Sequence, residues 1–348
     1  MAIEIIGTGR ALPSQRVSND DLAARIDTSD EWIRSHTGIG SRYIADDQTF
    51  TSDLAARAAN NALALVGGYS GDDPEERDRV AAEEVKSIGA IVVGTATPDY
   101  CGTPSTACIV QHKLGATKAW AQDVGAACTG FICAMETAAG LLTLSKTYKR
   151  VLAIGAEVLS KIVDWSDRGT CVLLGDGAGA VVLEKTCAPS EGEGRRGLVR
   201  SALYADGSRS ESLIVRRSGM RGRFMPGETV EKTPCLEMNG QEVYNFAVRA
   251  VTDTISELMQ LEGIGVDDLA WIIPHQANAR ILQAAGKRLK IPAEKFYLNI
   301  EEYANTSAAS IPIALDELSR GGKIARGDMI MTVGFGGGLT YGGNIIIW

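Results

Sequence analysis

The chain has 348 residues, of which 45% are hydrophobic and 22% are charged, and its formal net charge is −8 at pH 7. A chain of this length buries a large core, as one big domain or as two halves. The negative net charge argues against a protein that binds nucleic acids or membrane surfaces non-specifically. No basic segment followed by an apolar one opens the sequence, and no apolar run approaches a membrane span, so we expect neither a secretion signal nor a membrane protein.

The cysteines are odd in number and irregularly spaced, at positions 101, 108, 128, 133, 171, 187 and 235. They contain no CxxC pair, which argues against a disulfide framework or a zinc site. We therefore expect a cytoplasmic protein without a bound metal.

Strand and helix patterns alternate along the first half of the chain. Apolar runs predict strands at residues 1–9, 88–95, 118–124, 150–154 and, after a glycine turn, within 173–183. Capping residues and apolar spacings of three to four predict helices that begin near residues 18, 30, 51, 103 and 129. The stretch 67–86 is dense in charge, and we expect a solvated surface excursion that is helical in part.

A linker-like composition at residues 187–197 marks the boundary between two halves, 1–186 and 187–348. The second half predicts strands at 198–205, 269–273, 329–333 and 344–348, and helices at 239–261, from 278 to about 290, and at 305–319. The segment 206–234 is irregular and holds a basic cluster, namely Arg209, Arg216, Arg217, Arg221 and Arg223. Such a cluster either meets substrate phosphates or is a solvated loop.

The two halves resemble each other. Strand, glycine turn and strand follow one another in 151–183 and again in 329–347, and the turns 175–179 and 334–338 look equivalent. A strand followed by a helix occurs at Cys128 and again at His275. The pattern predicts an α/β fold of two similar halves, each with a mixed sheet, facing each other.

Cys128 lies where a predicted strand ends and a buried helix begins. The first N–H groups of a helix lack internal partners and favour negative charge, so a thiolate there is stabilised and nucleophilic. The other interpretation is a buried cysteine that acts as a small hydrophobe. This stretch alone leaves the two interpretations about equal.

Two further polar groups stand at the starts of helices. His275 is one of only three histidines, and Asn305 opens the last long helix. His275 could take the proton of Cys128 and later donate hydrogen bonds, and Asn305 could donate to a developing oxyanion. The glycine turn at 336–338 could bring a backbone N–H to the N–H of Cys128, and each such donor commonly contributes about 3 kcal/mol. The alternatives are a core histidine, a helix cap and a hairpin turn.

The chain resembles the β-ketoacyl-[acyl carrier protein] synthase III family of the thiolase superfamily over nearly its whole length. The motifs that carry the resemblance are Asp30–Ile33 with Thr37–Ile39, Asp123–Phe131, Ser166–Thr170, Gly175–Gly179, His275–Asn278, Asn305–Pro312 and Gly334–Gly338. The resemblance implies a duplicated α-β-α-β-α layered fold. It also implies a homodimer that needs no cofactor, because acyl-CoA is a substrate.

The resemblance implies a decarboxylative condensation that initiates fatty acid synthesis. Cys128 takes an acyl group from acyl-CoA, and His275 with Asn305 stabilises the enolate formed when malonyl-[acyl carrier protein] loses CO2. The N–H groups of Cys128 and Gly337 hold the oxyanion of the acyl-cysteine. The product is a 3-oxoacyl-[acyl carrier protein].

Outer binding residues are also implied by the resemblance. Trp32 and Arg168 would hold the CoA adenine between them by stacking and cation–π contact. A basic face made of Arg280, Lys287 and Arg288 would meet the acidic carrier protein.

Some residues depart from the family pattern. His36 replaces a common arginine, which affects one CoA contact. Thr103 would project from the partner subunit into the acyl tunnel, and because it is smaller than the bulky aromatic that limits other tunnels, it implies medium, branched or otherwise larger acyl groups.

Related enzyme classes fit less well. A thiolase needs a second cysteine in the C-terminal glycine turn, an elongating synthase needs a second histidine where Asn305 stands, and a hydroxymethylglutaryl-CoA synthase needs a glutamate base. A specialised condensing enzyme or acyltransferase of a secondary-metabolite pathway stays open. A non-catalytic scaffold is disfavoured because Cys128, His275 and Asn305 are all present.

Overall fold

The structure is a computed structural model that describes residues 1–187, 194–215 and 235–348. The prediction of an arginine cluster therefore lies largely outside the described residues, which include only Arg209 of that set. Arg209 lies in a 3-10 segment, Gly207–Ser212, followed by strand β9 (Leu213–Val215), which pairs with β10 (Leu236–Met238). The first residues of the segment predicted to be irregular thus form a 3-10 turn and a strand.

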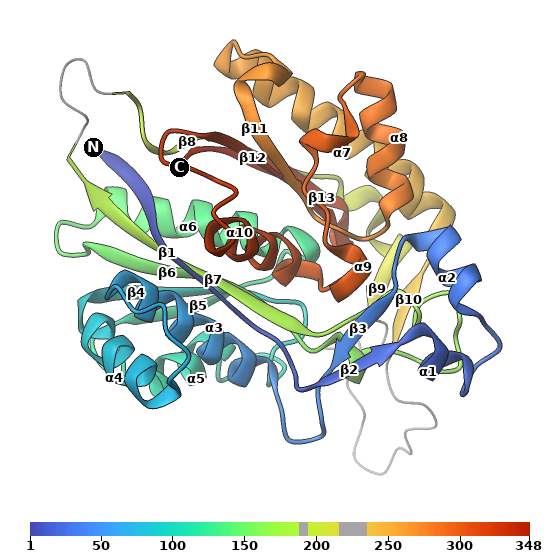
Figure 1. Ribbon diagram of the computed structural model, residues 1–348, viewed down its shortest axis with the longest axis horizontal. Coiled ribbons are helices and arrows are strands. Elements are labelled where there is room, and N and C mark those ends of the chain that lie inside the picture. Colours follow the sequence, from blue (N-terminus) through green and yellow to red (C-terminus); the bar gives the residue numbers. More distant parts are fainter. Residues whose placement is uncertain (188–193, 216–234) are drawn as a thin grey trace.

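Two mixed sheets carry the fold, and both have the same strand pattern (Figure 1). The first sheet has the order β1-β7-β6-β4-β5, and its strands are β1 (Ala2–Ala11), β4 (Ile88–Gly94), β5 (Trp120–Val124), β6 (Arg150–Glu157) and β7 (Gly177–Thr186). The second has the order β11-β12-β13-β8, with β8 (Gly197–Ala205), β11 (Leu269–Pro274), β12 (Met329–Gly336) and β13 (Thr340–Ile347). An isolated parallel bridge between Ile272 and Phe296 takes the place that β5 has in the first sheet.

Helices form three layers around these two sheets. Between the sheets lie α6 (Gly130–Leu144) and α10 (Ser310–Arg320), whose apolar residues join one buried cluster with strands of both sheets. The outer face of the first sheet is covered by α3 (Thr51–Val66) with α4 (Pro74–Glu84) and α5 (Thr106–Lys113). The outer face of the second is covered by α7 (Gly240–Glu262) and α8 (Ala279–Leu289). The predicted α-β-α-β-α layering is confirmed (Figure 1).

Smaller elements gather at one end of the molecule. They are β2 (Gln15–Ser18), which pairs with β3 (Ser41–Ile44), and the helices α1 (Asn19–Ala23), α2 (Asp30–Thr37) and α9 (Ile300–Tyr303). The charge-dense excursion forms α4, which starts with Asp73 as its cap and Pro74 in its first turn. Ala81 is its buried residue, and the rest of the helix is mostly solvated, as the composition predicted.

The strand registers correct the predicted equivalence of the two glycine turns. Gly155 of β6 faces Gly179 of β7, and Gly334 of β12 faces Gly342 of β13. Gly334–Gly338 therefore corresponds to the end of β6 and not to the turn Gly175–Gly179. Glycine spacing alone suggested otherwise because it carries no information on strand register.

Cys128 and His275 are not equivalent positions either. Cys128 lies in a 3-10 turn, Ala127–Thr129, that leads into α6, and the matching turn of the second half is Ser307–Ala309, which leads into α10. His275 follows β11, the counterpart of β4. The sequence pattern of strand then helix occurs at both places, but the strands occupy different positions in their sheets.

One expectation about apolar length is wrong. Among the described residues, Ala127–Leu144 is long and apolar enough to cross a membrane by length and composition. The stretch consists of α6 and the turn before it, and Phe131, Met135 and Leu142 are buried in the cluster between the two sheets. A core helix enclosed by two sheets is apolar on nearly all sides.

Close packing between helix starts and strand ends gives a testable prediction. A Cβ added at Gly155 would lie 2.1 Å from the carbonyl oxygen of Ala308, at the start of α10. We expect Gly155→Ala to lower the free energy of unfolding by about 2 kcal/mol or more, because backbone must move to admit the methyl group. The control is Gly140→Ala in α6, where nothing lies within 4 Å of the added Cβ.

The control should gain about 0.5–1 kcal/mol through helix propensity. Urea unfolding of both variants measures the difference. Equal stabilities for the two variants would contradict the packing argument.

Candidate active site

A single cavity of about 870 Å³ brings together the three predicted reactive side chains, Cys128, His275 and Asn305. They come from three different places in the fold: the turn before α6, the end of β11 and the loop before α10. Most of the remaining wall is apolar, with contributions from β9, β10 and the start of α7. The structure therefore confirms that the three groups share one cavity, which the sequence alone inferred only from their positions at element ends.

Cys128 sits in a strained turn against the end of β12. Ala127 before it has φ 44°, a left-handed conformation that costs a non-glycine residue about 1 kcal/mol or more. A Cβ on Gly336 would come 2.7 Å from the Cys128 nitrogen and 2.9 Å from its Cβ, so only glycine permits this approach. The turn thus points the thiol into the cavity while its backbone is held by the second half of the chain.

The thiol is not the ready thiolate that the sequence suggested. Burial raises the pKa of Cys128 to about 12, and the neighbouring Glu157 carboxylate raises it further, while the Ser307 hydroxyl acts in the opposite direction. The free thiol is therefore protonated near neutral pH. The local argument from the helix start did not include the enclosure by β12 and by the loop at Ser307.

His275 is 1% exposed, and its two ring nitrogens have different surroundings. Its Nδ1 lies 2.8 Å from the Ser310 hydroxyl, while its Nε2 is buried and has no hydrogen-bond partner among the described residues. The Phe335 ring packs against the imidazole with centroids 5.1 Å apart. Burial lowers the pKa of His275 to about 3, so the ring is neutral near pH 7.

Asn305 has a fixed amide orientation. Its Oδ1 accepts a hydrogen bond of 2.8 Å from the backbone N–H of Ser307. Its own backbone donates to Leu173 and accepts from Gly175, which holds the loop from the first half of the chain. Because Oδ1 is occupied, Nδ2 is the atom left to donate into the cavity.

Gly337 lies next to the cysteine turn, as predicted. A Cβ on Gly337 would be 3.4 Å from the Cβ of Ala127. Cys128 and Gly337 both line the cavity, and each lies in the first turn of a 3-10 segment, where N–H groups lack internal partners. An oxyanion hole made of these two N–H groups stays a prediction.

Sequence reasoning missed three supporting residues. Glu157 is fully buried and accepts hydrogen bonds from Ala96 N, the Thr97 hydroxyl and the Ser307 hydroxyl. Burial raises its pKa despite these donors. Ser307 and Ser310 belong to the quoted motif 305–312, but their roles depend on a turn geometry that the motif does not reveal.

Trp32 and Arg168 contact each other, although neither lines the cavity itself. The Arg168 guanidinium lies 4.9 Å from the Trp32 ring centroid. The His36 ring also stacks on Trp32, at 4.4 Å and 19°. Asn278, which lines the cavity, donates to the His36 carbonyl oxygen, so α2 lies at the cavity edge.

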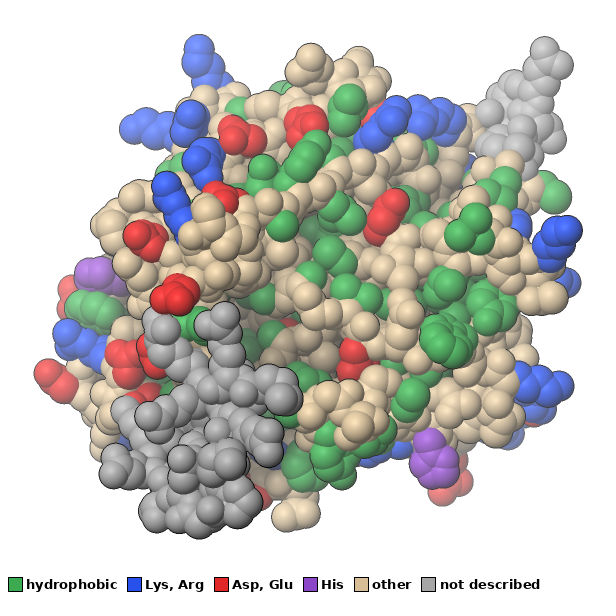
Figure 2. All heavy atoms as spheres, turned by 180° about the vertical axis from the view of Figure 1, so that it is seen from behind, with side chains coloured by type: hydrophobic (Ala, Val, Ile, Leu, Met, Phe, Trp, Pro, Cys, Tyr) green, Lys and Arg blue, Asp and Glu red, His purple; other side chains and the backbone are tan. Residues whose placement is uncertain are grey.

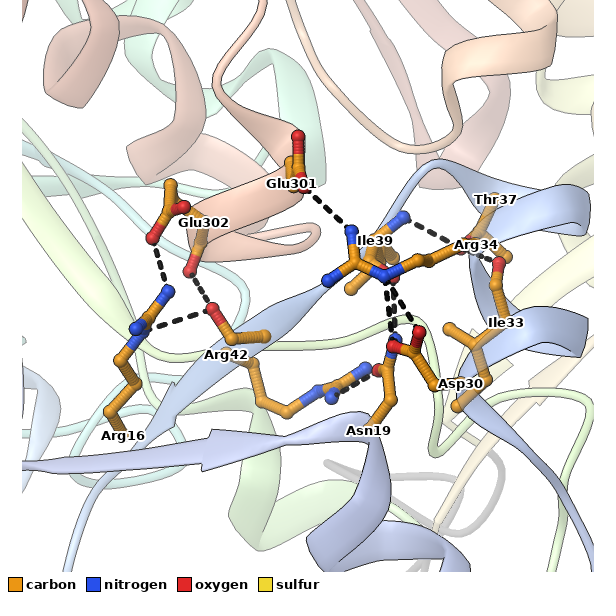
Figure 3. Close-up of polar contacts among 11 residues, drawn as sticks. Arg16, Asn19, Asp30, Ile33, Arg34, Thr37, Ile39, Arg42, Glu301 and Glu302 are labelled. Atoms are coloured by element: carbon orange, nitrogen blue, oxygen red, sulfur yellow. Dashed lines mark hydrogen bonds and ion pairs between the residues drawn. The ribbon is translucent and has the colours of Figure 1, made fainter.

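Ion pairs link α9, the short helix before Asn305, to both α2 and β2 (Figure 3). Arg34 donates to Asp30 within α2 and, at 2.6 Å, to Glu301 of α9. Arg16 pairs with Glu302 of the same short helix. The pair with Glu301 thus links α9 to α2 and the pair with Glu302 links α9 to β2, and because both are exposed each contributes little stability.

The predicted basic face is exposed on α8. Arg280, Lys287 and Arg288 are all exposed, while Ile281, Leu282 and Ala285 on the other side of the helix are buried. Figure 2 shows Lys and Arg side chains gathered over the region of α8. Thr103 is exposed, and among the described residues it does not line the cavity of its own chain, whereas Cys101 does.

The low pKa of His275 predicts a stability change with pH. Its usual pKa is 6.5, so between pH 6.5 and about 3 the unfolded chain binds a proton that the folded chain does not. Stability is therefore full above pH 6.5 and is lost as the pH falls, by about 1 kcal/mol per pH unit from this group. We expect His275→Asn to remove that component from urea unfolding measured between pH 6 and 4.

The control is His112→Asn, because His112 is exposed on α5. It should keep the wild-type slope of unfolding free energy against pH. An unchanged slope in His275→Asn would show that His275 is not buried as a neutral ring.

Comparisons with known proteins agree with this geometry. The family model described as 3-Oxoacyl-[acyl-carrier-protein (ACP)] synthase III matches residues 122–207, and its C-terminal counterpart matches residues 259–348. A relative from Clostridium perfringens, "Beta-ketoacyl-[acyl-carrier-protein] synthase III", is 46% identical over 343 residues, which cover 99% of this chain and 98% of the relative.

Solved structures are similar over the same extent. The 3-oxoacyl-[acyl-carrier-protein] synthase III from Aquifex aeolicus has a TM-score of 0.84 at 39% identity, with 100% of both chains covered. The priming β-ketosynthase from the R1128 polyketide biosynthetic pathway has a TM-score of 0.86 at 31% identity, with 99% of this chain and 96% of that chain covered. The chain therefore belongs to the β-ketoacyl-[acyl carrier protein] synthase III family, which consists of condensing acyltransferases with the thiolase fold.

Proposed function

We propose that this chain condenses an acyl-CoA primer with malonyl-[acyl carrier protein] and so initiates fatty acid synthesis. The products are a 3-oxoacyl-[acyl carrier protein], CoA and CO2. The observation that carries the proposal is that Cys128, His275 and Asn305 line one mostly apolar cavity. His275 Nε2 has no partner among the described residues, and the Asn305 amide oxygen is already bonded to Ser307 N–H, which leaves the amide nitrogen to donate. Family membership over the full chain supports the same reaction.

In the first half of the reaction, Cys128 Sγ attacks the thioester carbon of acyl-CoA. The N–H groups of Cys128 and Gly337 stabilise the oxyanion of the tetrahedral intermediate. The C–S bond to CoA then breaks, and the thiol proton of Cys128 ends on the sulfur of the departing CoA. Because the resting thiol is protonated, this proton must move as the new bond forms.

In the second half, malonyl-[acyl carrier protein] places its thioester oxygen between His275 Nε2 and Asn305 Nδ2. Loss of CO2 leaves its electron pair as an enolate, whose charge sits on that oxygen. Two neutral donors in a low-dielectric cavity lower this barrier more than they would in water. The enolate carbon attacks the acyl group, and Cys128 leaves as a thiolate that regains a proton.

The outer residues support substrate binding in this proposal. Trp32 and Arg168 would hold adenine between them once the Arg168 side chain moves outward, because the guanidinium now lies 4.9 Å from the Trp32 ring centroid and fills that space. His36 also stacks on Trp32, where the family often has an arginine. The exposed cations of α8 face outward near the rim, where an acidic carrier protein would dock. We place this protein in the cytoplasm as a homodimer without a cofactor, with halves divided at residues 186 and 187.

The acyl group is the least constrained part of the proposal. Thr103 is exposed in the single chain, where it is available to enter the cavity of a partner subunit. Its small side chain supports medium, branched or otherwise larger primers. A ranking of acylation rates over acyl-CoAs of increasing length and branching tests this, and exclusive use of acetyl-CoA would contradict it.

A specialised synthase of a secondary pathway is the second candidate. The likeness to a polyketide priming ketosynthase favours it, although at lower identity than the fatty acid relatives. The two candidates differ in their acceptor. Acylated protein that releases no CO2 from malonyl-[acyl carrier protein] but transfers its acyl group to another acceptor would favour the specialised enzyme.

The nucleophile can be identified by intact mass. We expect wild-type protein incubated with acyl-CoA to gain one acyl mass and Cys128→Ala to gain none. The matched control is Cys133→Ala, one and a half turns further along α6, which should acylate like the wild type. Acylation that persists in Cys128→Ala, or a wild type that accepts no acyl-CoA of the panel, would overturn the proposal.

The basic face can be tested by charge reversal. We expect replacement of Arg280, Lys287 and Arg288 by Glu to raise KM for malonyl-[acyl carrier protein] about tenfold or more at low salt, with acylation by acyl-CoA within about twofold of wild type. The control reverses three cations around α4, Arg77, Arg79 and Lys86, which changes net charge equally on a remote surface. Equal effects of both triple variants would mean that only net charge matters.

A further inference from the structure

His275 has two conceivable tasks in the proposed reaction, and each requires a different state of Nε2. To take the thiol proton, Nε2 must carry a lone pair; to stabilise the enolate oxygen, it must carry a hydrogen. A neutral imidazole has only one N–H, and its position is set by the group that Nδ1 meets. The inference below rests on the proposed function and concerns that group.

Nδ1 meets a hydroxyl. Ser310, the first residue of α10, is 4% exposed, and its Oγ lies 2.8 Å from Nδ1 of His275. The same hydroxyl is also placed to donate to the carbonyl oxygen of Ser307, at 3.0 Å, and that oxygen lies close enough to the imidazole to accept from it too. A carbonyl only accepts hydrogen bonds, whereas a hydroxyl accepts or donates.

The single proton of the Ser310 hydroxyl has two acceptors within reach, the Ser307 carbonyl oxygen and Nδ1 of His275. The Ser307 carbonyl already accepts the backbone N–H of Ser310, so it keeps a partner when the hydroxyl leaves it. The separation from Nδ1 is also the shorter of the two. If the hydroxyl were absent, Nδ1 would face the Ser307 carbonyl alone, and the ring proton would have to sit on Nδ1.

We propose that Ser310 is a positioning residue that fixes the tautomer of His275. Its hydroxyl donates to Nδ1 and so leaves the ring proton on Nε2, the nitrogen that has no partner among the described residues. His275 then presents N–H to the cavity beside the amide of Asn305. On this basis His275 is a hydrogen-bond donor in both halves of the reaction and not the base that removes the thiol proton.

The proposal separates the two half-reactions. In Ser310→Ala the ring proton moves to Nδ1, and Nε2 presents a lone pair to the malonyl oxygen in place of a donor. We expect CO2 release by pre-acylated protein to fall about 100-fold, the loss typical of one oxyanion donor. Acylation from acyl-CoA, followed by intact mass, should stay within about threefold of wild type.

Two variants control for packing. Ser310→Thr keeps the hydroxyl and should release CO2 within about fivefold of wild type. Thr306→Val removes a neighbouring buried hydroxyl that has no partner among the described residues, and should leave both half-reactions unchanged. A parallel loss of acylation and CO2 release in Ser310→Ala, or no loss of CO2 release, would overturn the proposal.

A spectroscopic measurement tests the tautomer directly. With only three histidines in the chain, 15N-labelled rings can be assigned by the loss of one signal set in His275→Asn. We expect the proton on Nε2 of His275 in wild type and on Nδ1 in Ser310→Ala. A wild-type proton on Nδ1 would overturn the proposal, whereas a wild type that neither acylates nor releases CO2 would overturn the proposed function instead.

Discussion

The packing of two helix starts against glycine strand ends is the constraint on which the site depends. The turn at Cys128 lies against Gly336 and the turn at Ala308 lies against Gly155, each at a distance that leaves no room for a Cβ. Gly94 meets the first turn of α6 in the same way. Because protein interiors are close-packed and do not deform continuously, these contacts fix the turns and therefore the reactive groups that the turns carry.

The same packing sets the electrostatics of the cavity. Burial raises the pKa of the Cys128 thiol, although the residue is partly exposed, and lowers the pKa of the enclosed His275, so the neutral form of each is favoured. A site of neutral donors suits a reaction in which charge appears only transiently on an oxygen. Glu157 follows the same trend, because burial raises its pKa even though four hydrogen-bond donors, from Thr95, Ala96, Thr97 and Ser307, surround its carboxyl group.

Much of the fold was predictable because strands and helices of this protein follow their local patterns closely. The strands followed from apolar runs and glycines, and the meeting of Cys128, His275 and Asn305 from their positions at element ends, whereas the layers followed from the resemblance that the quoted motifs carry. The predictions that were wrong needed information on distant parts of the chain. Strand register decides which glycine turns correspond, and enclosure by a distant strand raises the pKa of Cys128. The role of Ser310 depends on a turn in which Ser307 has φ 48°, a conformation that its residue type does not signal.

The two parts of the chain contribute different groups to the cavity, which bears on how the chain can be divided. The first half supplies the nucleophile, while the second supplies His275, Asn305 and the glycine that backs the cysteine. Neither part of the chain thus holds all the groups of the cavity by itself. A cut in the linker between the halves would leave two fragments that are complementary in chemistry as well as in shape.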